Sequence, residues 1–579
     1  MRSIAIAVML LVAGVWAAED GSKANPLTVS SAQDLVDLGE AVKMGTDYKG
    51  VRIANMGAGL HFKQTADIDL STVCGREIGN WHSIGPFAGS YDGANHKISN
   101  LFIDEDVDTE ASPGLFGIIL SNTTDTVYYE NIVLEKAYIH ASGIVGGILS
   151  QAVSGVVAVR NNKVDLEFKS GASSTLQFGG VVGNTLSESM SVRGNSVKGS
   201  ILVTSGDMSY VAGILGLIVG GTVEMLDNVN EANFVVKGDV LPTIGGNVGL
   251  IAALCTMKNN TNKGDILVES TKKTQTKSEL MFIGGLVAVG SMKGYAVSIV
   301  GNVNYGKVEV SGGNASVGGI FGLVQADSTA LLDSCFNMGE VIYHGAENPE
   351  AVYVGGAVGM WEGVEATRLE NSGNILVENA AKPSVGGLVG FVRNGTKSIK
   401  LTKSINKGKI TVKNEQPIAG WVAGLVGSTD SLEYAELNNC TNKGNIEIIG
   451  KADASLVTSE LAVVHMGARF LDNACVNEGE ILFLAEGPIE LPTPVVKKSL
   501  NVRVVDMGEG RITLEIPGMD SFASGRVRVG VYSYDGKRQP VSLNASGNLL
   551  HLEGLPSAGR FLVRVSTPSG NSSVPVTLR

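Results

Sequence analysis

Two short phrases return along the chain at nearly constant distance, and this repetition restricts the fold more than any other feature of the sequence. One phrase is a pair of small residues, then two mostly apolar residues and a glycine, at residues 179–183, 212–216, 245–249, 318–322, 386–390 and 423–427. The other is Asn-x-Gly followed by alternating β-branched residues, with its asparagine at Asn262, Asn304, Asn337, Asn371, Asn406, Asn442 and Asn477. From Asn304 onward these asparagines are 33, 34, 35, 36 and 35 residues apart.

A period of this length indicates a structural repeat, because one unit is too short to bury its own apolar face. Neighbouring units must stack, and the core then runs through the whole array. The strands after the turns alternate between apolar and polar residues, as in residues 307–310 and 409–412, which predicts strands that are buried on one face. The sequence therefore predicts an all-β solenoid.

The repeated glycines and asparagines are interpreted as turn chemistry. Glycine readily adopts a positive φ, which tight turns such as Asp92-Gly93 and each Asn-x-Gly are expected to use. The Gly-Gly phrases are expected to be buried strands in which glycine permits close approach of the backbone. Asparagines stacked at one corner can hydrogen-bond along the solenoid axis as a ladder, which satisfies amides that are costly to bury.

The composition excludes two classes of protein. Hydrophobic residues make up 44% of the chain, which argues against intrinsic disorder. The net charge is −12, with no stripe of basic residues, so we expect no binding to nucleic acid.

The amino terminus indicates export. Residues 1–18 contain Arg2, an apolar run from Ile4 to Val15 and small residues before an acidic pair, which is typical of a secretory signal peptide. The run is too short for a membrane anchor, and no other segment predicts a membrane span. The mature protein is expected to be secreted or held at the cell surface.

Five cysteines fit an exported chain without forming a disulfide framework. Cys335, Cys440 and Cys475 each lie two residues before a turn asparagine, so they are expected to stack on neighbouring units. Cys440 and Cys475 could then approach bonding distance. Parallel side chains suit that bond poorly, and free buried thiols are the favoured interpretation, with the bond left open.

The first coils are expected within residues 19–100. Ser30 and Ser31 precede a helical pattern with Leu35, Leu38 and Val42 on one face and an end near Gly45. An amphipathic helix of this kind can cover the exposed end of a solenoid, so we predict an N-terminal capping helix.

Residues 62–117 carry the most specific motifs, among them 67–70 (Asp-Ile-Asp-Leu), 87–101 and 114–117 (Gly-Leu-Phe-Gly). With the degenerate Gly-Gly phrases, residues 27–490 resemble bacterial surface proteins that carry the GLUG motif. That motif is also found in the non-catalytic β-helical part of some IgA-specific metalloproteases. The resemblance implies a right-handed parallel β-helix of the pectin-lyase type over residues 101–490, and an adhesin-like role.

The repeat stops near Leu491, and the prolines at 492 and 494 predict a linker over residues 491–500. Short alternating strands follow over residues 501–579, with Asp535-Gly536 as a hairpin signal, which indicates a small antiparallel β-sandwich. Residues 531–537 and 552–565 resemble the C-terminal sorting domain of type IX secretion, although Phe561 stands where that pattern usually has tyrosine. The resemblance implies a secretion signal in this domain.

Catalytic signals are sparse. A glycoside hydrolase needs two carboxylates about 5–10 Å apart, and Asp67 with Asp69 is the candidate pair, with His82 or His96 beside it. A structural role for these residues is favoured, because they lie in motifs shared with non-enzymatic relatives. No His-Glu-x-x-His occurs, and no calcium-binding repeat is present, so no metal and no cofactor are expected.

Two functions remain open. The favoured one is an exported, non-enzymatic β-helical surface protein that binds an extracellular glycan or protein. The alternative is a polysaccharide lyase or glycoside hydrolase on the same scaffold. In either case the binding site is expected where the repeat is interrupted, in residues 269–279 or 345–350.

Overall fold

The computed structural model describes residues 19–578, apart from residues 107, 110, 122–123, 172–174, 205–207, 274–275, 328–329, 346–348, 364, 381, 394–397, 431–433, 465–468, 485–502, 509, 516–527, 534–537, 547–548 and 568–569. The chain divides into two compact units, Met1–Glu486 and Gly487–Arg579. The predicted signal peptide, the linker and the Asp535-Gly536 hairpin lie outside the described residues.

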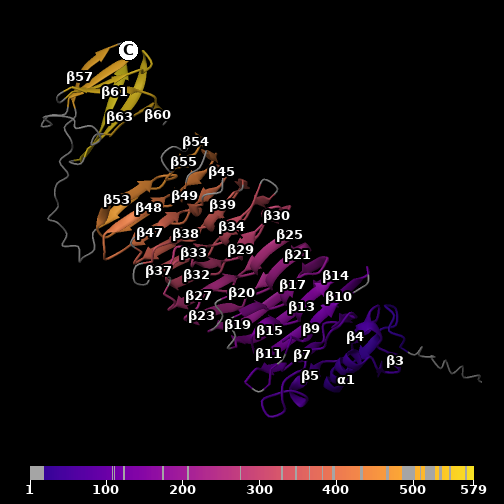
Figure 1. Ribbon diagram of the computed structural model, residues 1–579. Helices are drawn as coiled ribbons and strands as arrows, with labels where there is room; N and C mark the ends of the chain where they lie inside the picture. The colour runs from indigo at the N-terminus through magenta and orange to yellow at the C-terminus, as the bar shows by residue number, and fades with distance from the viewer. Residues whose placement is uncertain are drawn as a thin grey trace, which may run out of the picture. The chain divides into compact units, whose positions relative to one another are not determined.

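The first unit is an all-β parallel solenoid of about 13 turns, as the repeat predicts. We call one turn a coil. In a typical coil β33 (Ala315–Gly318) leads to β34 (Phe321–Gln325), β35 (Leu331–Asp333), β36 (Phe336–Asn337) and β37 (Val341–Gly345). The next strand, β38 (Val352–Gly355), pairs in parallel with β33. Figure 1 shows the coils stacked side by side from the region of α1 to β54 (Arg469–Asn473).

The strands of successive coils form three sheets, which we call sheets 1, 2 and 3. Sheet 1 contains the strand before each Gly-Gly phrase: β12 (Gly143–Gly146), β16 (Thr175–Gly179), β20 (Met208–Ala212), β24 (Pro242–Gly245), β28 (Met281–Gly284), β33, β38, β43 (Ser384–Gly386), β48 (Ile418–Ala423) and β53 (Ala452–Ser459). Sheet 2 receives the next strands of each coil, among them β17 (Val182–Thr185), β21 (Leu215–Leu226), β25 (Val248–Lys258), β29 (Val287–Ser291), β34, β39 (Val358–Glu362), β44 (Val389–Val392) and β49 (Val426–Thr429). Sheet 3 contains the strands around each Asn-x-Gly turn, such as β36 and β37.

Each Gly-Gly pair forms the corner between sheets 1 and 2 rather than the middle of a buried strand. A Cβ placed on Gly284 would lie 1.9 Å from the carbonyl oxygen of Val287, so no side chain fits there. A Cβ on Gly285 would lie 2.1 Å from the carbonyl oxygen of Gly319 on the next coil, and 2.4 Å from the Asn304 amide. The two repeated phrases therefore contact each other inside every such coil.

The expectation that glycine supplies a positive φ in the Asn-x-Gly turns is wrong. The residues with positive φ do not include Gly306 or Gly339, nor Gly93 of the Asp92-Gly93 pair. The glycine is needed for close stacking instead, since a Cβ on Gly339 would lie 1.9 Å from the carbonyl oxygen of Gly306 in the preceding coil.

The left-handed residue of each coil lies at another corner, between sheets 2 and 3. Its φ is 58° at Asn161, 57° at Asp227, 50° at Ser334, 51° at Lys403 and 52° at Asn439. Most of these residues are not glycine, which explains why a search for glycine turns in the sequence does not find this corner. Asparagine and aspartate tolerate the left-handed region better than most residues.

The predicted asparagine ladder is confirmed. Nδ2 of Asn371 donates to Oδ1 of Asn406 at 2.9 Å, and Nδ2 of Asn406 donates to Oδ1 of Asn442 at 2.9 Å. Asn406 also donates to the carbonyl oxygen of Gly408 at 3.0 Å, inside its own turn. The same pattern joins the turn asparagines of eight successive coils, from Asn230 to Asn477.

A second ladder, which was not predicted, lies two residues before the first. It runs through Asn162, Asn195, Asn228, Asn260 and Asn302, whose amides are fully or almost fully buried. After Asn302 the position is taken by Cys335 and later by Cys440 and Cys475. The predicted cysteine column is thus the continuation of an asparagine column.

All five cysteines have free thiols. The backbone N–H of Cys440 contacts Sγ of Cys475 at 3.2 Å, so these residues are stacked on neighbouring coils, as the repeat predicts. Burial raises the pKa of Cys335 to about 11 and that of Cys255 to about 12. These thiols pack in the core as small apolar side chains.

Helix α1 (Ala32–Met44) begins and ends as the sequence predicts. The Ser31 side chain accepts a hydrogen bond from the N–H of Asp34, and Gly45 closes the helix at a φ of 63°. Leu35 and Leu38 are fully buried in the same apolar core as the first coils. Within the described residues, neither this helix nor any other has the length and apolar character needed to cross a membrane.

The second unit contains two four-stranded antiparallel sheets. One is formed by β57 (Arg503–Gly508), β58 (Arg511–Glu515), β62 (Leu549–Glu553) and β61 (Ser542–Ser546). The other is formed by β60 (Arg538–Gln539), β59 (Arg528–Ser533), β63 (Gly559–Thr567) and β64 (Gly570–Leu578). Side chains from both sheets, such as Leu514 and Val563, belong to one apolar cluster.

Candidate functional site

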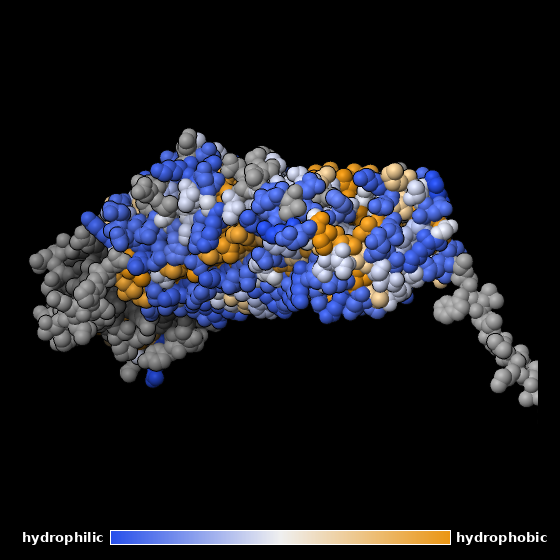
Figure 2. Space-filling model, turned by 90° about the horizontal axis from the view of Figure 1, so that it is seen from below, coloured by the Kyte–Doolittle hydropathy of each residue, from blue (hydrophilic) through white to orange (hydrophobic). Residues whose placement is uncertain are grey.

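The outer surface of the solenoid carries a hydrophobic cluster that is separate from its core. Its buried members are Ala288, Val289, Leu323 and Met360. Leu250, Leu280, Phe282, Tyr353 and Phe391 pack against them and are only partly buried. We call the surface formed by this cluster and by the outward side chains of sheets 1 and 2 beside it the outer groove. On the face shown in Figure 2, hydrophobic side chains also gather in patches between hydrophilic ones.

One wall of the outer groove is a continuous row of apolar side chains on sheet 2. Strand register places Leu217, Leu250, Val289, Leu323, Met360 and Phe391 in line on six successive coils. The inward neighbours of these residues, such as Trp361, lie in the solenoid core, so the row itself faces outward. At the same register, the coil before this row has the polar residue Asn184, and the coil after the row has the polar residue Ser428.

The other wall belongs to sheet 1, where large aromatic residues occupy every second coil. The outward register runs through Tyr210, Thr243, Phe282, Ser316, Tyr353, Ser384 and Trp421. Ser316 and Ser384 are buried, whereas Trp421 is 41% exposed. The small hydroxyl residues leave room between the rings of the neighbouring coils.

The two walls meet at Tyr353 and Phe391, whose ring centroids lie 4.5 Å apart with an interplanar angle of 15°. The hollow beside this pair has a volume of about 340 Å³, which lies within the range of small-ligand sites, about 300–1,000 Å³. Burial raises the pKa of Tyr353, while nearby Arg393 acts in the opposite direction. The phenol therefore stays protonated and can donate a hydrogen bond.

Charged groups lie at the edge of the hollow. Lys277, Arg393 and Asp430 line it together with Ser278. Among the residues that the structure describes, neither Lys277 nor Arg393 has an ion-pair partner. Lys277 and Ser278 come from the interruption at residues 269–279 that the sequence singles out, of which residues 274–275 are not described. The other interruption, 345–350, includes the undescribed residues 346–348.

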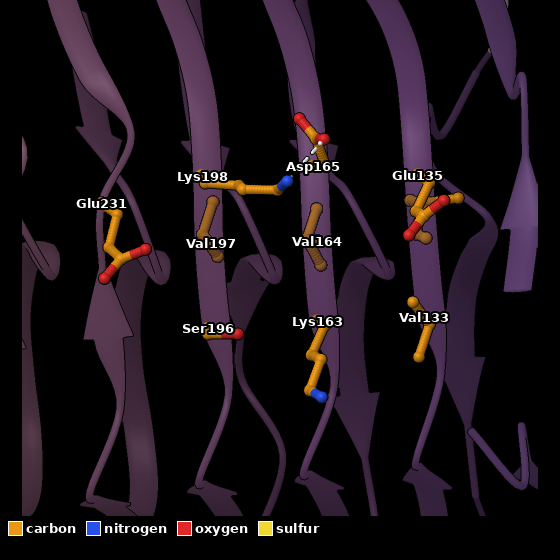
Figure 3. Close-up of a pocket in the computed structure, with 10 residues that line it drawn as sticks. Val133, Glu135, Lys163, Val164, Asp165, Ser196, Val197, Lys198 and Glu231 are labelled. Atoms are coloured by element: carbon orange, nitrogen blue, oxygen red, sulfur yellow. Dashed lines mark ion pairs between the residues drawn. The ribbon is translucent and has the colours of Figure 1, made fainter. Parts of the chain in front are cut away.

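A second hollow, on sheet 3, has a different character. It has a volume of about 250 Å³ and is lined by charged residues of neighbouring coils, as Figure 3 shows. Lys198 pairs with Asp165 at 3.0 Å, and this hydrogen bond raises the pKa of Lys198. Glu231 pairs with Lys263 at 2.7 Å. The charged groups of this second hollow already neutralise one another between coils. A charged ligand would therefore find fewer unpaired groups here than in the outer groove.

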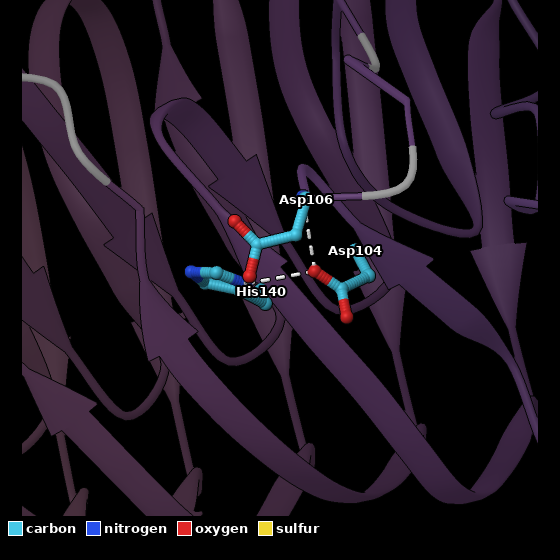
Figure 4. Close-up of side chains that lie close together, drawn as sticks. All are labelled: Asp104, Asp106 and His140. Atoms are coloured by element: carbon cyan, nitrogen blue, oxygen red, sulfur yellow. Dashed lines mark hydrogen bonds and ion pairs between the residues drawn. The ribbon is translucent and has the colours of Figure 1, made fainter. Parts of the chain in front are cut away.

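Asp104, Asp106 and His140 form a third cluster, whose ligand-type atoms all lie within 4.8 Å of one another. Figure 4 shows both carboxylates directed toward the imidazole. Nδ1 of His140 lies 2.8 Å from the buried carboxylate of Asp104, which Arg76 also approaches at 3.3 Å. Burial opposes ionisation of Asp104, but the hydrogen bonds from His140 and from the N–H of Asp106 hold its pKa below the usual value. Within the cluster itself, the contacts join one buried imidazole to two carboxylates.

The structure places Asp67 and Asp69 on either side of the buried Ile68, with both carboxylates facing outward. Asp67 accepts a hydrogen bond from the N–H of Lys97 at 2.9 Å, and Nδ1 of His96 lies 3.4 Å away. The hydrogen bond from the Lys97 N–H lowers the pKa of Asp67.

Asp69 ends β5 (Ile68–Asp69) and accepts hydrogen bonds from Asn100 at 2.7 Å and from the N–H of Ser71 at 2.9 Å. These contacts lower its pKa as well, with the Asn100 bond as the larger cause. Both carboxylates thus close turns in the first coils, and their catalytic role stays a prediction.

The aromatic residues of the outer groove were not found from the sequence, although a signal is present. Each outward residue of sheet 1 stands two positions before the first residue of a Gly-Gly or Ala-Gly pair, as Tyr353 stands before Gly355 and Trp421 before Ala423. Aligning the repeats on that pair brings the four aromatic residues into one column. The second asparagine ladder has a similar signal, the Asn-x-Asn spacing that ends in Asn262 and Asn304.

Comparisons with known proteins add little to this picture. No family model matches the chain, and no curated protein matches it. Among solved structures, the chain is similar to a Bacteroides ovatus protein that is provisionally named an immunoglobulin A1 protease. The identity is 15%, the match covers 76% of this chain and 85% of that one, and the TM-score is 0.20.

Proposed function

We propose that the protein is an exported, non-enzymatic β-helical surface protein, adhesin-like, that binds an extracellular glycan or protein ligand. The observation that carries this proposal is the outer groove. An apolar cluster with stacked Tyr353 and Phe391 lies outside the solenoid core and is still partly exposed. Exposed apolar surface that is rimmed by polar groups is typical of interaction sites.

The groove also fits a binding role because it is built on regular strands. Its side chains come from successive coils that the two asparagine ladders and the Gly-Gly corners hold in register. Sites on rigid elements present their side chains in fixed positions, which lowers the entropy lost when a ligand binds.

The enzymatic alternative has less support. A general acid that works near neutral pH needs a raised pKa, and hydrolases tune one carboxyl group upward for this purpose. Hydrogen bonds lower the pKa of both Asp67 and Asp69. Both carboxylates therefore stay ionised, which suits turn closure and not proton donation.

The helix, the C-terminal unit and the amino terminus also have proposed roles. Helix α1 is proposed to cap the amino-terminal end of the solenoid, because Leu35 and Leu38 lie in its core. The shared apolar cluster of the two C-terminal sheets supports a β-sandwich, which is proposed to act as a type IX sorting domain. With a signal peptide over residues 1–18, the protein would end at the cell surface or outside the cell, and its solenoid would wind in the right-handed, pectin-lyase-like sense.

A glycan array combined with a reducing-sugar release assay tests this function. The mature protein is expected to bind immobilised glycans, to lose binding when Tyr353 is replaced by alanine, and to release no sugar. Release from any polysaccharide that Asp67→Ala or Asp69→Ala abolishes would establish the enzymatic alternative. A protein ligand would appear as a silent glycan array together with Tyr353-dependent binding to an extracellular protein.

A further inference from the structure

The spacing of the aromatic side chains in the outer groove identifies a class of ligand. Parallel coils stack about 4.8 Å apart, so rings on alternate coils recur every ~9.6 Å along the axis. Tyr210, Phe282, Tyr353 and Trp421 follow this spacing over seven successive coils. A ligand that matches such a wall must itself be linear and periodic, with a repeat near this length.

A β-linked polysaccharide whose linkages keep the chain in an extended ribbon has this property. Successive sugars of its extended chain are flipped, so the same sugar face recurs at every second residue, and the chain advances by about one aromatic spacing per disaccharide. The C–H groups on one face of a pyranose carry partial positive charge, and they pack favourably on the negative face of an aromatic ring. An α-linked chain that winds as a helix would not keep one face on a straight row of rings.

The charges beside the groove specify the ligand further. Lys277 and Arg393 line the hollow next to Tyr353, and neither has an ion-pair partner among the described residues. Several other basic residues of the solenoid are paired between coils, as Lys198 is with Asp165 and Lys407 with Glu370. Against the one carboxylate of Asp430 in the same lining, these two cations leave the hollow with an excess of positive charge, which is complementary to a carboxylate on the ligand.

We infer that the outer groove binds a linear β-linked polysaccharide with a disaccharide repeat in which one sugar carries a carboxylate. The chain lies parallel to the solenoid axis. Its neutral sugars stack on Phe282, Tyr353 and Trp421, and its carboxylates face Lys277 and Arg393. This inference rests on the proposed binding function and names the ligand class of the same site.

The test measures the affinity of the mature protein for three sets of oligosaccharides by isothermal titration calorimetry. Hyaluronan tetra-, hexa- and octasaccharides are the matching probes, cellohexaose is β-linked but neutral, and hexagalacturonate is acidic but α-linked. Hyaluronan affinity is expected to rise with each added disaccharide, since each one reaches a further ring. Cellohexaose is expected to bind at least about tenfold more weakly than hyaluronan hexasaccharide, and hexagalacturonate more weakly still.

Single substitutions locate the binding. Tyr353→Ala is expected to weaken the hyaluronan hexasaccharide at least about tenfold, and Arg393→Gln to reduce its affinity toward that of cellohexaose. Trp421→Ala removes an exposed ring outside the apolar cluster, so it spares the packing and is expected to weaken the octasaccharide most. The control is Tyr305→Ala, which removes a ring that is 56% exposed in an Asn-x-Gly turn beside sheet 3 and should leave every affinity unchanged.

Two results would overturn the inferred class, namely equal affinity for hexagalacturonate and hyaluronan hexasaccharide, or a hyaluronan tetrasaccharide that binds as tightly as the octasaccharide. If some other glycan or a protein bound in a Tyr353-dependent manner, the binding function would stand and the ligand class would fail. If Tyr305→Ala weakened binding as much as Tyr353→Ala and Trp421→Ala do, the outer groove would be excluded as the site and both proposals would fail.

Discussion

Replacing Asn406 by leucine tests the asparagine ladder, which holds the solenoid coils in register. Asn406 is fully buried, and its amide takes part in four hydrogen bonds. It donates to Asn442 and to the carbonyl oxygen of Gly408, and it accepts from Asn371 and from the N–H of Gly408. Leucine has a similar shape but makes none of these bonds.

The expected loss follows from the groups that are left without a partner. Oδ1 of Asn442 and the carbonyl oxygen of Gly408 both lie in the interior and lose the side-chain donor that Asn406 provides. A buried polar group without a hydrogen bond costs about 1–3 kcal/mol, so the substitution is expected to lower the unfolding free energy by about 2–6 kcal/mol. The matched control is Lys407→Ala, which breaks an exposed ion pair with Glu370 worth about 0–1 kcal/mol.

The assay is guanidinium unfolding followed by far-ultraviolet circular dichroism. Because repeat arrays can depart from two-state behaviour, the midpoint and the slope are compared together across wild type and both variants. Asn406→Leu should lower the midpoint clearly, and Lys407→Ala should leave it nearly unchanged. Equal shifts for the two variants would refute the ladder as a source of stability.

Three further predictions concern the corners, the carboxylates and the thiols. Lys403→Gly should raise the unfolding free energy by about 1 kcal/mol in the same assay. A non-glycine residue with a left-handed φ costs about 1–2 kcal/mol, and the greater chain entropy of glycine in the unfolded state offsets part of this gain. A lower unfolding free energy for this variant would contradict the prediction. The pKa of Asp104 is lowered in the folded state, so its stabilisation is present above the unfolded pKa of about 3.9 and is lost as pH falls below it. The stability gap between wild type and Asp104→Asn should therefore close at acid pH, and a gap that widens there would argue against this cause. Thiol titration of denatured, unreduced protein should give all five cysteines, whereas a Cys440–Cys475 bond would lower the count by two.

Much of the solenoid can be predicted from the sequence because its repeat positions carry strong local chemistry. The turn asparagines recur with nearly constant spacing, and helix α1 has both a serine at its start and a glycine at its end. Stacking of coils follows from the repeat alone, since the spacing brings equal positions together. The asparagine ladder could be predicted for the same reason.

Other features depend on contacts that a single repeat does not reveal. The Asn-x-Gly glycine looks like a residue chosen for positive φ, but Gly339 is there because the carbonyl oxygen of Gly306 leaves no room for a Cβ. The left-handed corner is occupied by residues as different as Ser334 and Lys403, so no residue type marks it. Such positions are set by packing between coils, which sequence spacing does not show.

The outer groove was missed for a related reason. Tyr353 and Phe391 are 38 residues apart in sequence and lie on different sheets, and each alone looks like an ordinary outward residue of a strand. Their stacking depends on the corner that the Gly-Gly pair forms between sheets 1 and 2. The catalytic candidates Asp67 and Asp69, in contrast, stand out in the sequence because turn closure also selects aspartate.

Protection of Trp421 from a fluorescence quencher tests the ligand-binding groove most directly. Among the described tryptophans, Trp81 and Trp361 are buried, and Trp421 is 41% exposed on the aromatic wall. Acrylamide should therefore quench mainly Trp421 in the free protein. Hyaluronan octasaccharide is predicted to protect it, and Trp421→Phe should abolish the quenchable signal. Saturating ligand that leaves the quenching of Trp421 unchanged would contradict binding along this wall.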